Sequence, residues 1–181
     1  MRLSRWEHVS VDPAEGCIMK IGLISDTHND IEMIEHAIEV FKEREVDLVI
    51  HAGDLTSAKL ISLFRGLPCR FVLGNCDIDI EDINAIAGEL GFGCVDKCCE
   101  FEADEKKFIV FHGNDVPLFR KAVSSGKYDY IIKGHTHMFE NYTSDKTRII
   151  NPGSLYRAEE HTVAILDTEK DKVEKIRIEI D

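Results

Sequence analysis

Apolar and polar positions follow two periods along the first part of the chain. Short apolar runs predict strands over residues 21–25, 47–52, 70–73, 108–111 and 128–132. Apolar residues at helical spacing predict helices from about residue 30 to 44, around 60–64, from about 83 to 90, and from Pro117. Strands and helices therefore alternate, which is the pattern of a parallel sheet built from βαβ units.

The pattern changes toward the end of the chain. Residues 148–150, 162–166 and 173–180 read as strands with no helix between them, and Ile176, Ile178 and Ile180 alternate with charged residues. These strands predict a second, largely antiparallel sheet that packs against the first. Residues 1–18 lack such periodicity, and we expect either a flexible extension or a start codon assigned too early.

Composition is that of a soluble globular protein, with 44% hydrophobic and 31% charged residues in a chain of 181. The apolar runs have the length of strands, so no membrane span is expected. Residues 1–18 contain charged side chains and lack the apolar run of a secretory signal. We therefore expect a cytoplasmic protein.

The charge and the cysteines restrict the chemistry. A net charge of −12 argues against non-specific nucleic-acid binding, which depends on lysine and arginine meeting phosphates. If the protein handles phosphate, the positive charge must be local, and bound cations can supply it. The six cysteines show no paired Cys-x-x-Cys spacing, so we expect free thiols rather than a zinc ribbon or a disulfide framework.

Polar residues follow five of the predicted strands at the point where each strand ends. These tips are Ser25-Asp26-Thr27-His28, Gly53-Asp54, Gly74-Asn75-Cys76-Asp77, His112-Gly113-Asn114 and Gly134-His135-Thr136-His137. The carboxyl ends of parallel strands share one edge of a sheet, where open α/β folds place their ligand crevice. Tips that lie far apart in the sequence are therefore expected to meet in space.

The residue types at these tips are those of a metal site. Seven side chains offer imidazole or oxygen ligands suited to Mn, Fe, Zn or Ni, namely Asp26, His28, Asp54, Asn75, His112, His135 and His137. Each piece alone is common in turns and on surfaces, but five on successive strand ends are not explained by accident. Seven ligands exceed the four of a structural zinc site, so two ions that share a carboxylate are expected. His51, inside an apolar strand, is expected to be buried and hydrogen-bonded, with a supporting role behind a ligand as the alternative.

The five tips, DTH, GD, GNCD, HG and GHTH, resemble the ordered pattern of the calcineurin-like metallophosphoesterase superfamily between Ile18 and about Ser154. The small size and the segment Asn151-Pro152-Gly153-Ser154 resemble its small bacterial and archaeal phosphodiesterases. The resemblance implies an α/β fold, a four-layer α-β-β-α sandwich of two mixed sheets flanked by helices, over residues 19–181.

The resemblance also implies how two metal ions are held. The first ion would take Asp26, His28, Asp54 and His137. The second would take Asp54, Asn75, His112 and His135, with Asp54 as the bridge. Mn²⁺ is the expected ion, with Ni²⁺, Fe²⁺ and Zn²⁺ as alternatives. Two such ions would allow a metal-bound hydroxide to hydrolyse a small-molecule or nucleotide phosphodiester, and would attract its anion to an acidic protein.

Other functions stay open at this point. The retromer subunit of the same fold is a protein-binding scaffold that has lost catalytic competence, although all seven ligand positions are filled here. A phosphomonoesterase or a nuclease would use the same chemistry. The sequences of the loops around residues 77–82 and 114–118 do not identify the substrate.

Cys76 departs from the larger members of the superfamily. They usually carry histidine at this position, where it is thought to assist the leaving group or steady the phosphate. Here the thiol is either a catalytic group or a small side chain that fills space, while Asp77 is retained. A thiol is a weak proton donor in both cases.

Overall fold

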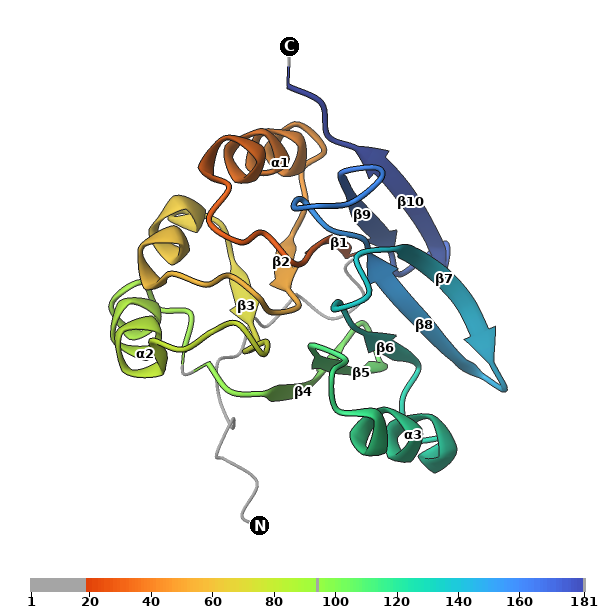
Figure 1. Ribbon diagram of the computed structural model, residues 1–181. Helices are drawn as coiled ribbons and strands as arrows, with labels where there is room; N and C mark the ends of the chain where they lie inside the picture. Colours follow the sequence, from red (N-terminus) through yellow and green to blue (C-terminus); the bar gives the residue numbers. More distant parts are fainter. Residues whose placement is uncertain (1–18, 94, 181) are drawn as a thin grey trace.

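The computed structural model describes residues 19–93 and 95–180, and its strands form two five-stranded sheets (Figure 1). The first sheet has the order β10-β9-β1-β2-β3, with β1 at Lys20–Ile24, β2 at Leu48–His51, β3 at Cys69–Phe71, β9 at Thr162–Asp167 and β10 at Lys172–Arg177. The second has the order β4-β5-β6-β8-β7, with β4 at Cys98–Ala103, β5 at Lys106–Phe111, β6 at Tyr130–Ile132, β7 at Phe139–Ser144 and β8 at Thr147–Pro152. The expected extension, residues 1–18, lies outside the described residues.

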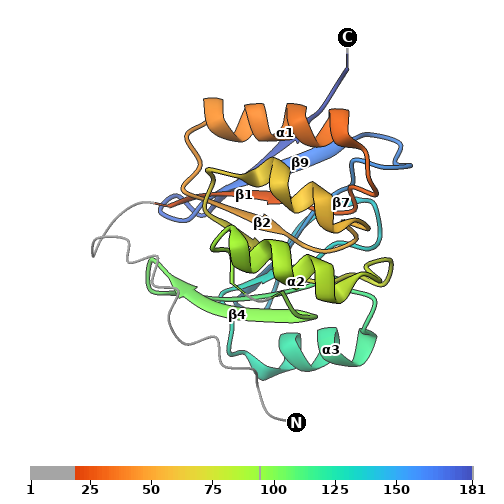
Figure 2. The same ribbon diagram turned by 90° about the vertical axis from the view of Figure 1, so that its left-hand side faces the viewer.

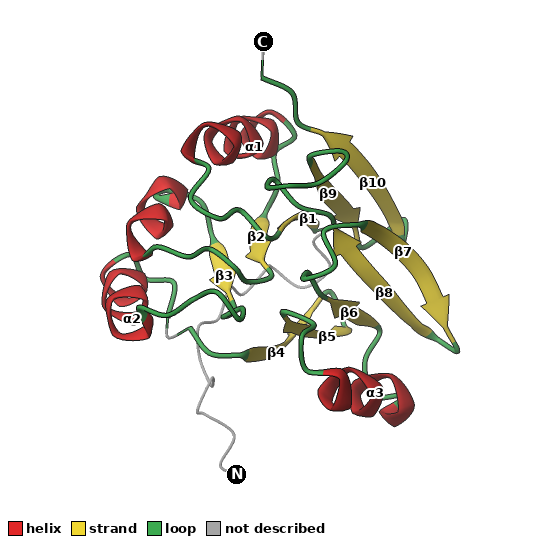
Figure 3. Ribbon diagram, viewed as in Figure 1, coloured by secondary structure: helices red, strands yellow, loops and turns green. Residues whose placement is uncertain are grey.

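Four helical segments cover the two sheets (Figure 3). They are α1 at Ile31–Glu43, the 3₁₀ segment η1 at Ala58–Phe64, α2 at Ile80–Glu89 and α3 at Val116–Ser125. Asp30 caps α1 by accepting the Met33 N–H at 3.2 Å, and Asp115 caps α3 by accepting the Leu118 N–H at 2.9 Å. These caps fix helix starts that lie directly after polar strand tips.

Three apolar layers hold the sheets and helices together. One packs α1, η1 and α2 on the first sheet, one fills the space between the sheets, and one packs α3 on the second sheet. Strand β5 shows the alternation: Phe108 and Val110 point between the sheets, whereas Ile109 and Phe111 face α3. The result is the expected four-layer sandwich, with α1 and α3 on opposite sides of the molecule (Figure 2).

The division of strands between the sheets corrects one expectation. Strands β5 and β6 do not extend the sheet of β1, β2 and β3. Instead, β9 pairs with β1 and β10 pairs with β9, so these two strands join the first sheet rather than forming a second antiparallel one. Both sheets are mixed. In the first, β1, β2 and β3 run parallel and β9 is antiparallel to β1. In the second, β5, β6 and β8 run parallel, with β4 antiparallel to β5 and β7 antiparallel to β8. The pattern of apolar positions predicts a strand but does not name its partner.

Strands β4 and β7 were not expected. Their sequences, CCEFEA and FENYTS, carry charged and polar residues, and each strand lies at a sheet edge with some of its residues exposed. Edge strands of this composition lack the apolar run that identifies a buried strand.

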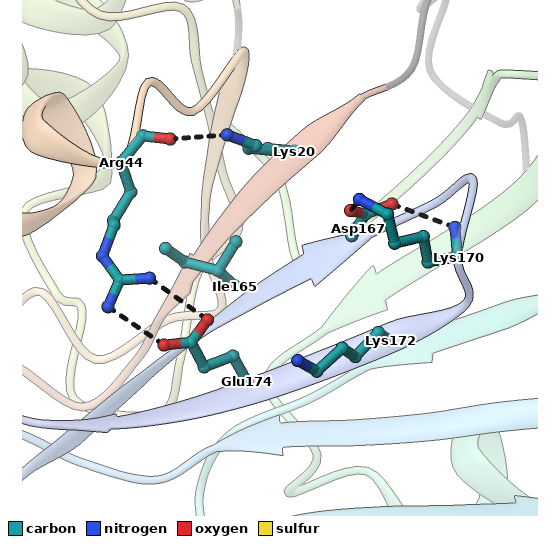
Figure 4. A pocket seen from close by; sticks show the side chains of 7 residues that line it. All are labelled: Lys20, Arg44, Ile165, Asp167, Lys170, Lys172 and Glu174. Atoms are coloured by element: carbon teal, nitrogen blue, oxygen red, sulfur yellow. Dashed lines mark hydrogen bonds and ion pairs between the residues drawn. The ribbon is translucent and has the colours of Figure 1, made fainter.

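A surface pocket of about 220 Å³ lies beside the start of β1, at the opposite end of the strand from the polar tip (Figure 4). Ion pairs occupy much of its wall: Arg44 pairs with Glu174 at 3.0 Å, and Lys170 pairs with Asp167 at 2.9 Å. None of the predicted ligands lines it. The candidate chemistry therefore lies elsewhere, at the carboxyl ends of the strands.

Two simpler expectations agree with the described residues. None of the helices there is long and apolar enough to cross a membrane. Cys69, Cys76, Cys98 and Cys99 are free thiols.

Candidate metal centre

The tips of five strands bring acidic, imidazole and thiol side chains into one cluster. Three overlapping groups have ligand atoms within 4.8 Å of one another: Asp26 with His28 and His137, Asp26 with Asp54 and His112, and His28 with Asp54 and Cys76. The strands involved belong to both sheets, and the loops that follow them meet at one edge of the sandwich (Figures 1 and 2). The convergence expected from the sequence is present.

Each buried carboxylate is fixed by one of its oxygens. Asp26 Oδ2 accepts hydrogen bonds from Ser25 Oγ at 2.6 Å and from the His135 N–H at 3.0 Å. Asp54 Oδ1 accepts the Cys76 N–H at 2.8 Å. The second oxygen of each group is thereby aimed into the cluster.

These second oxygens face imidazole nitrogens. Asp26 Oδ1 lies 3.2 Å from His137 Nε2 and 3.8 Å from His112 Nε2. Asp54 Oδ2 lies 3.3 Å from His112 Nε2 and 3.5 Å from His28 Nε2. Asp26 Oδ1, His28 Nε2 and His112 Nε2 are nevertheless buried without a hydrogen-bond partner among the described residues. Buried polar atoms are nearly always satisfied, so three in one place indicate an additional binding partner.

The tautomer of His112 makes a cation a suitable partner. His112 Nδ1 lies 2.8 Å from the carbonyl oxygen of Ala52, which only accepts, so Nδ1 carries the proton and the neutral ring directs a lone pair from Nε2. This lone pair points at carboxylate oxygens of Asp26 and Asp54. Burial lowers the pKa of His112, but these carboxylates and the Ala52 carbonyl shift the pKa upward overall. A divalent ion satisfies the same atoms without protonation, and the donor set of imidazoles and carboxylates suits it.

The backbone at the tips is held in a conformation that L-residues rarely adopt. Positive φ angles occur at Asp26 (53°), His28 (42°), Asp54 (57°), His135 (72°) and His137 (58°). Such residues persist where the surrounding structure over-determines them, and they concentrate at functional sites. Five of the seven predicted ligands share this feature.

Two glycines let the backbone approach the ligand carboxylates. A Cβ on Gly74 would overlap Asp54 Oδ1, and a Cβ on Gly134 would overlap Ser25 Oγ and lie 2.7 Å from Asp26 Oδ2. Only glycine fits at either position. The position of the Asp54 carboxylate therefore requires glycine at position 74, and the positions of Ser25 and the Asp26 carboxylate require glycine at position 134.

Comparison with known proteins assigns the family. The family model described as the calcineurin-like phosphoesterase superfamily domain matches residues 19–171. The chain belongs to the calcineurin-like phosphoesterase superfamily.

Individual members agree with this assignment. Phosphodiesterase MJ0936 of Methanocaldococcus jannaschii is 36% identical over 174 residues, covering 89% of this chain and all of that protein. A solved archaeal phosphodiesterase superposes with a TM-score of 0.84 at 34% identity, covering 88% of this chain and all of the other. Vps29 of Entamoeba histolytica, solved with Zn²⁺, superposes with a TM-score of 0.57 at 18% identity over 88% of this chain and 98% of its own, and that likeness shows the fold alone.

The remaining predicted ligands of this metallophosphoesterase lie at the border of the cluster. His135 is exposed, with its ring centroid 5.1 Å from that of the buried His112. Asn75 is also exposed, and its Nδ2 donates to Cys76 Sγ at 3.3 Å. Both side chains adjoin the cluster at its solvent side, and their ligand role stays a prediction.

His51 is fully buried and hydrogen-bonded, as expected. Its Nδ1 accepts the Gly53 N–H at 3.2 Å, so Nε2 carries the proton and donates to Thr27 Oγ1 at 3.1 Å. Burial lowers its pKa to about 3, which keeps the ring neutral. His51 therefore links the tips of β1 and β2 and supports the metallophosphoesterase site from behind.

Asp77 does not point toward the cluster. Its carboxylate accepts three backbone N–H groups, from Asp54 at 3.0 Å, Thr56 at 2.6 Å and Gly74 at 2.7 Å. It is buried and ties the tip of β2 to the tip of β3. Its role is to position Asp54, a role that the Gly-Asn-x-Asp motif alone does not reveal.

Replacing Asp77 with alanine is expected to lower the free energy of unfolding by about 2–4 kcal/mol, because three N–H donors lose a charged acceptor. Chemical denaturation measures this loss. Asp79→Ala is the matched control, since the exposed Asp79 makes no side-chain cap hydrogen bond, and it should change stability by less than about 0.5 kcal/mol. If both changes lowered the free energy of unfolding equally, Asp77 would not have the role of holding the tips of β2 and β3 together.

Sequence reasoning assigned no role to the residues that hold the His135–His137 loop. Asn151 Nδ2 donates to the Gly134 carbonyl oxygen at 2.9 Å and to Thr136 Oγ1 at 3.0 Å. Ser154 Oγ lies 2.9 Å from the Asp26 carbonyl oxygen. The segment 151–154 marked the family in the sequence, but only the fold places it under two ligand loops.

Proposed function

We propose that the protein is a metal-dependent phosphodiesterase that hydrolyses a small-molecule or nucleotide phosphodiester at a dinuclear centre. The observation that carries the proposal is the convergence of Asp26 Oδ1, His28 Nε2 and His112 Nε2 around Asp54. All three atoms are buried and have no hydrogen-bond partner within the described part of the chain. The similarity to a protein named a phosphodiesterase supports the same class of reaction.

The proposed ligands divide into two sets that meet at Asp54. One set is Asp26, His28, Asp54 and His137, and the other is Asp54, Asn75, His112 and His135. Asp54 Oδ2 supports this division, because it lies within 3.5 Å of a histidine from each set, His28 and His112. We expect Mn²⁺ in both positions.

The protein residues prepare the centre for a phosphoester. Divalent ions in such a centre supply Lewis-acid stabilisation of the phosphoryl group and generate a nucleophile from water near neutral pH. The Ala52 carbonyl keeps His112 in the tautomer that offers Nε2, and the Cys76 N–H holds Asp54 in place. The pKa of Asp54 lies below its ordinary value. Burial alone would raise this pKa, but the contacts with His112 and the Cys76 N–H lower it by more than burial raises it. Asp54 is therefore ionised and ready to bind cations at neutral pH.

Metal analysis of the purified protein, beside hydrolysis of bis(p-nitrophenyl) phosphate and p-nitrophenyl phosphate, tests the proposal. We expect bound divalent metal and faster cleavage of the diester. Preference for the monoester would instead identify a phosphomonoesterase. Bound metal with no cleavage of either ester would favour the protein-binding scaffold.

Cys76 defines a prediction about leaving groups. The Cys76 sulfur lies within 4.8 Å of ligand atoms of His28 and Asp54. Burial together with the Asp54 carboxylate raises the pKa of the thiol to about 11. A thiol with this pKa is a weak proton donor, so diesters with poor leaving groups should be cleaved slowly. General acid catalysis contributes about 10²–10⁴-fold, and Cys76→His should recover part of it for poor leaving groups only.

Rates across a series of leaving groups test this prediction for the wild type, Cys76→His and Cys76→Ala. Cys76→Ala should cost little with an activated diester, because a nitrophenolate leaves without a proton. A large loss for Cys76→Ala on that substrate would mean that the thiol is catalytic.

A further inference from the structure

Several exposed apolar residues follow the strand tips of the candidate metal centre. Seven large apolar residues of the described chain are exposed, namely Ile31, Ile78, Ile80, Val116, Met138, Tyr142 and Ile180. The first five of these lie one to three residues after the strand tips that carry the predicted ligands. We call these five residues the apolar rim.

The fold places the apolar rim at the edge of the sandwich where the ligands lie. Ile31, Ile80 and Val116 are the first residues of α1, α2 and α3, and all three helices begin at this edge (Figure 2). Met138 follows His137, and Ile78 comes two residues after Cys76. The rim residues thus come from four loops that surround one cluster of ligands.

The exposure of these side chains indicates a binding surface. Ile78 is 78% exposed and Met138 is 63% exposed. Single exposed apolar residues are ordinary on a protein surface, but several around one site mark a surface that binds an apolar group. Ligand sites usually combine such apolar walls with a few polar groups that fix orientation, here the metal ligands.

The charge of the rim loops selects among phosphoesters. None of the rim loops contains lysine or arginine. There are two acidic residues in 29–33, three in 78–82 and one in 113–117, and residues 135–138 contain no acidic residue. A substrate with several negative charges beyond the scissile phosphate would meet repulsion from these loops. A nearby cation outside them is the exposed Arg157, which lies over the ring of Tyr156 beside His28. A diester has a single negative charge, which the metal centre can neutralise.

We propose that the apolar rim binds an uncharged apolar ester group, so that the substrate class is a monoanionic phosphodiester bearing an alkyl or aryl group. This inference rests on the proposed function, because the rim has a substrate role only if the centre cleaves phosphodiesters. The scissile phosphate then lies at the metal ligands and the alkyl or aryl group lies against residues such as Ile78 and Met138.

The proposal is tested on the metal-loaded protein with two diesters that share the same leaving group, methyl p-nitrophenyl phosphate and hexyl p-nitrophenyl phosphate. Full burial of a methylene favours binding by about fourfold, so partial burial of five should raise kcat/KM of the hexyl ester by about tenfold or more over the methyl ester. Ile78→Ser and Met138→Ser should each reduce this ratio by about twofold or more. Tyr142→Ser, which removes an exposed apolar residue from β7, is the matched control and should leave the ratio unchanged.

The outcomes separate this inference from the function on which it rests. Cleavage of both esters with equal kcat/KM would overturn the rim proposal and leave the phosphodiesterase proposal standing. Cleavage of neither ester would contradict the phosphodiesterase proposal itself. An unchanged hexyl-to-methyl ratio in Ile78→Ser and Met138→Ser, together with a changed oligomeric state, would assign the rim to a protein interface and overturn its role toward substrate.

Discussion

Replacing Asp54 with alanine is expected to abolish phosphodiester hydrolysis and to lower the bound metal by about one or two ions per chain. Asp54 Oδ2 lies 3.5 Å from His28 Nε2 and 3.3 Å from His112 Nε2, so its loss affects both proposed ion positions. Metal ions supply several kcal/mol of transition-state stabilisation, and the expected fall in kcat/KM is therefore at least about 10³-fold. Metal analysis and turnover of bis(p-nitrophenyl) phosphate measure the two effects together.

Asp82→Ala is the matched control for this change, because it removes an exposed acidic side chain from α2. It should retain metal and activity. An Asp54→Ala protein with wild-type metal content and turnover would refute the two-metal assignment.

Removal of the metal with a chelator is expected to abolish turnover while the fold persists. Three apolar layers pack the sheets and helices together, and none of them depends on the metal ligands. A core of this size differs from a zinc finger, whose folding requires its ion. The far-ultraviolet circular dichroism spectrum should therefore be nearly unchanged when activity is lost.

Adding Mn²⁺ back should restore turnover to the chelated protein. Collapse of the spectrum on chelation would instead mean that the metals are structural, and a scaffold function would then fit better than an enzyme.

The convergence of the candidate ligands was predictable because each of them lies in a short local motif. Asp26, Asp54 and His112 follow apolar strands, and residues at the carboxyl ends of such strands share an edge wherever the strands run parallel. The side chains converge even though the strands belong to two sheets, a case that this rule does not cover. Their expected convergence did not require the pairing of the strands to be known.

Features that depend on long-range pairing were not predictable in the same way. β9 reads as a strand in the sequence, but only the folded chain pairs it with β1 across more than half of the domain. Asp77 looks like a third polar residue of its tip, yet three backbone N–H groups turn it away from the cluster. Asn151 likewise has a role only where the fold brings it under the Gly134 loop.

The most direct test of the proposed dinuclear centre is a titration of the metal-free protein with Mn²⁺, in which bound ions and diester turnover are recorded on the same samples. We expect two ions per chain at saturation, with turnover rising as the second position fills. Saturation at a single ion with full turnover, or binding of two ions without any turnover, would contradict a two-metal phosphodiesterase.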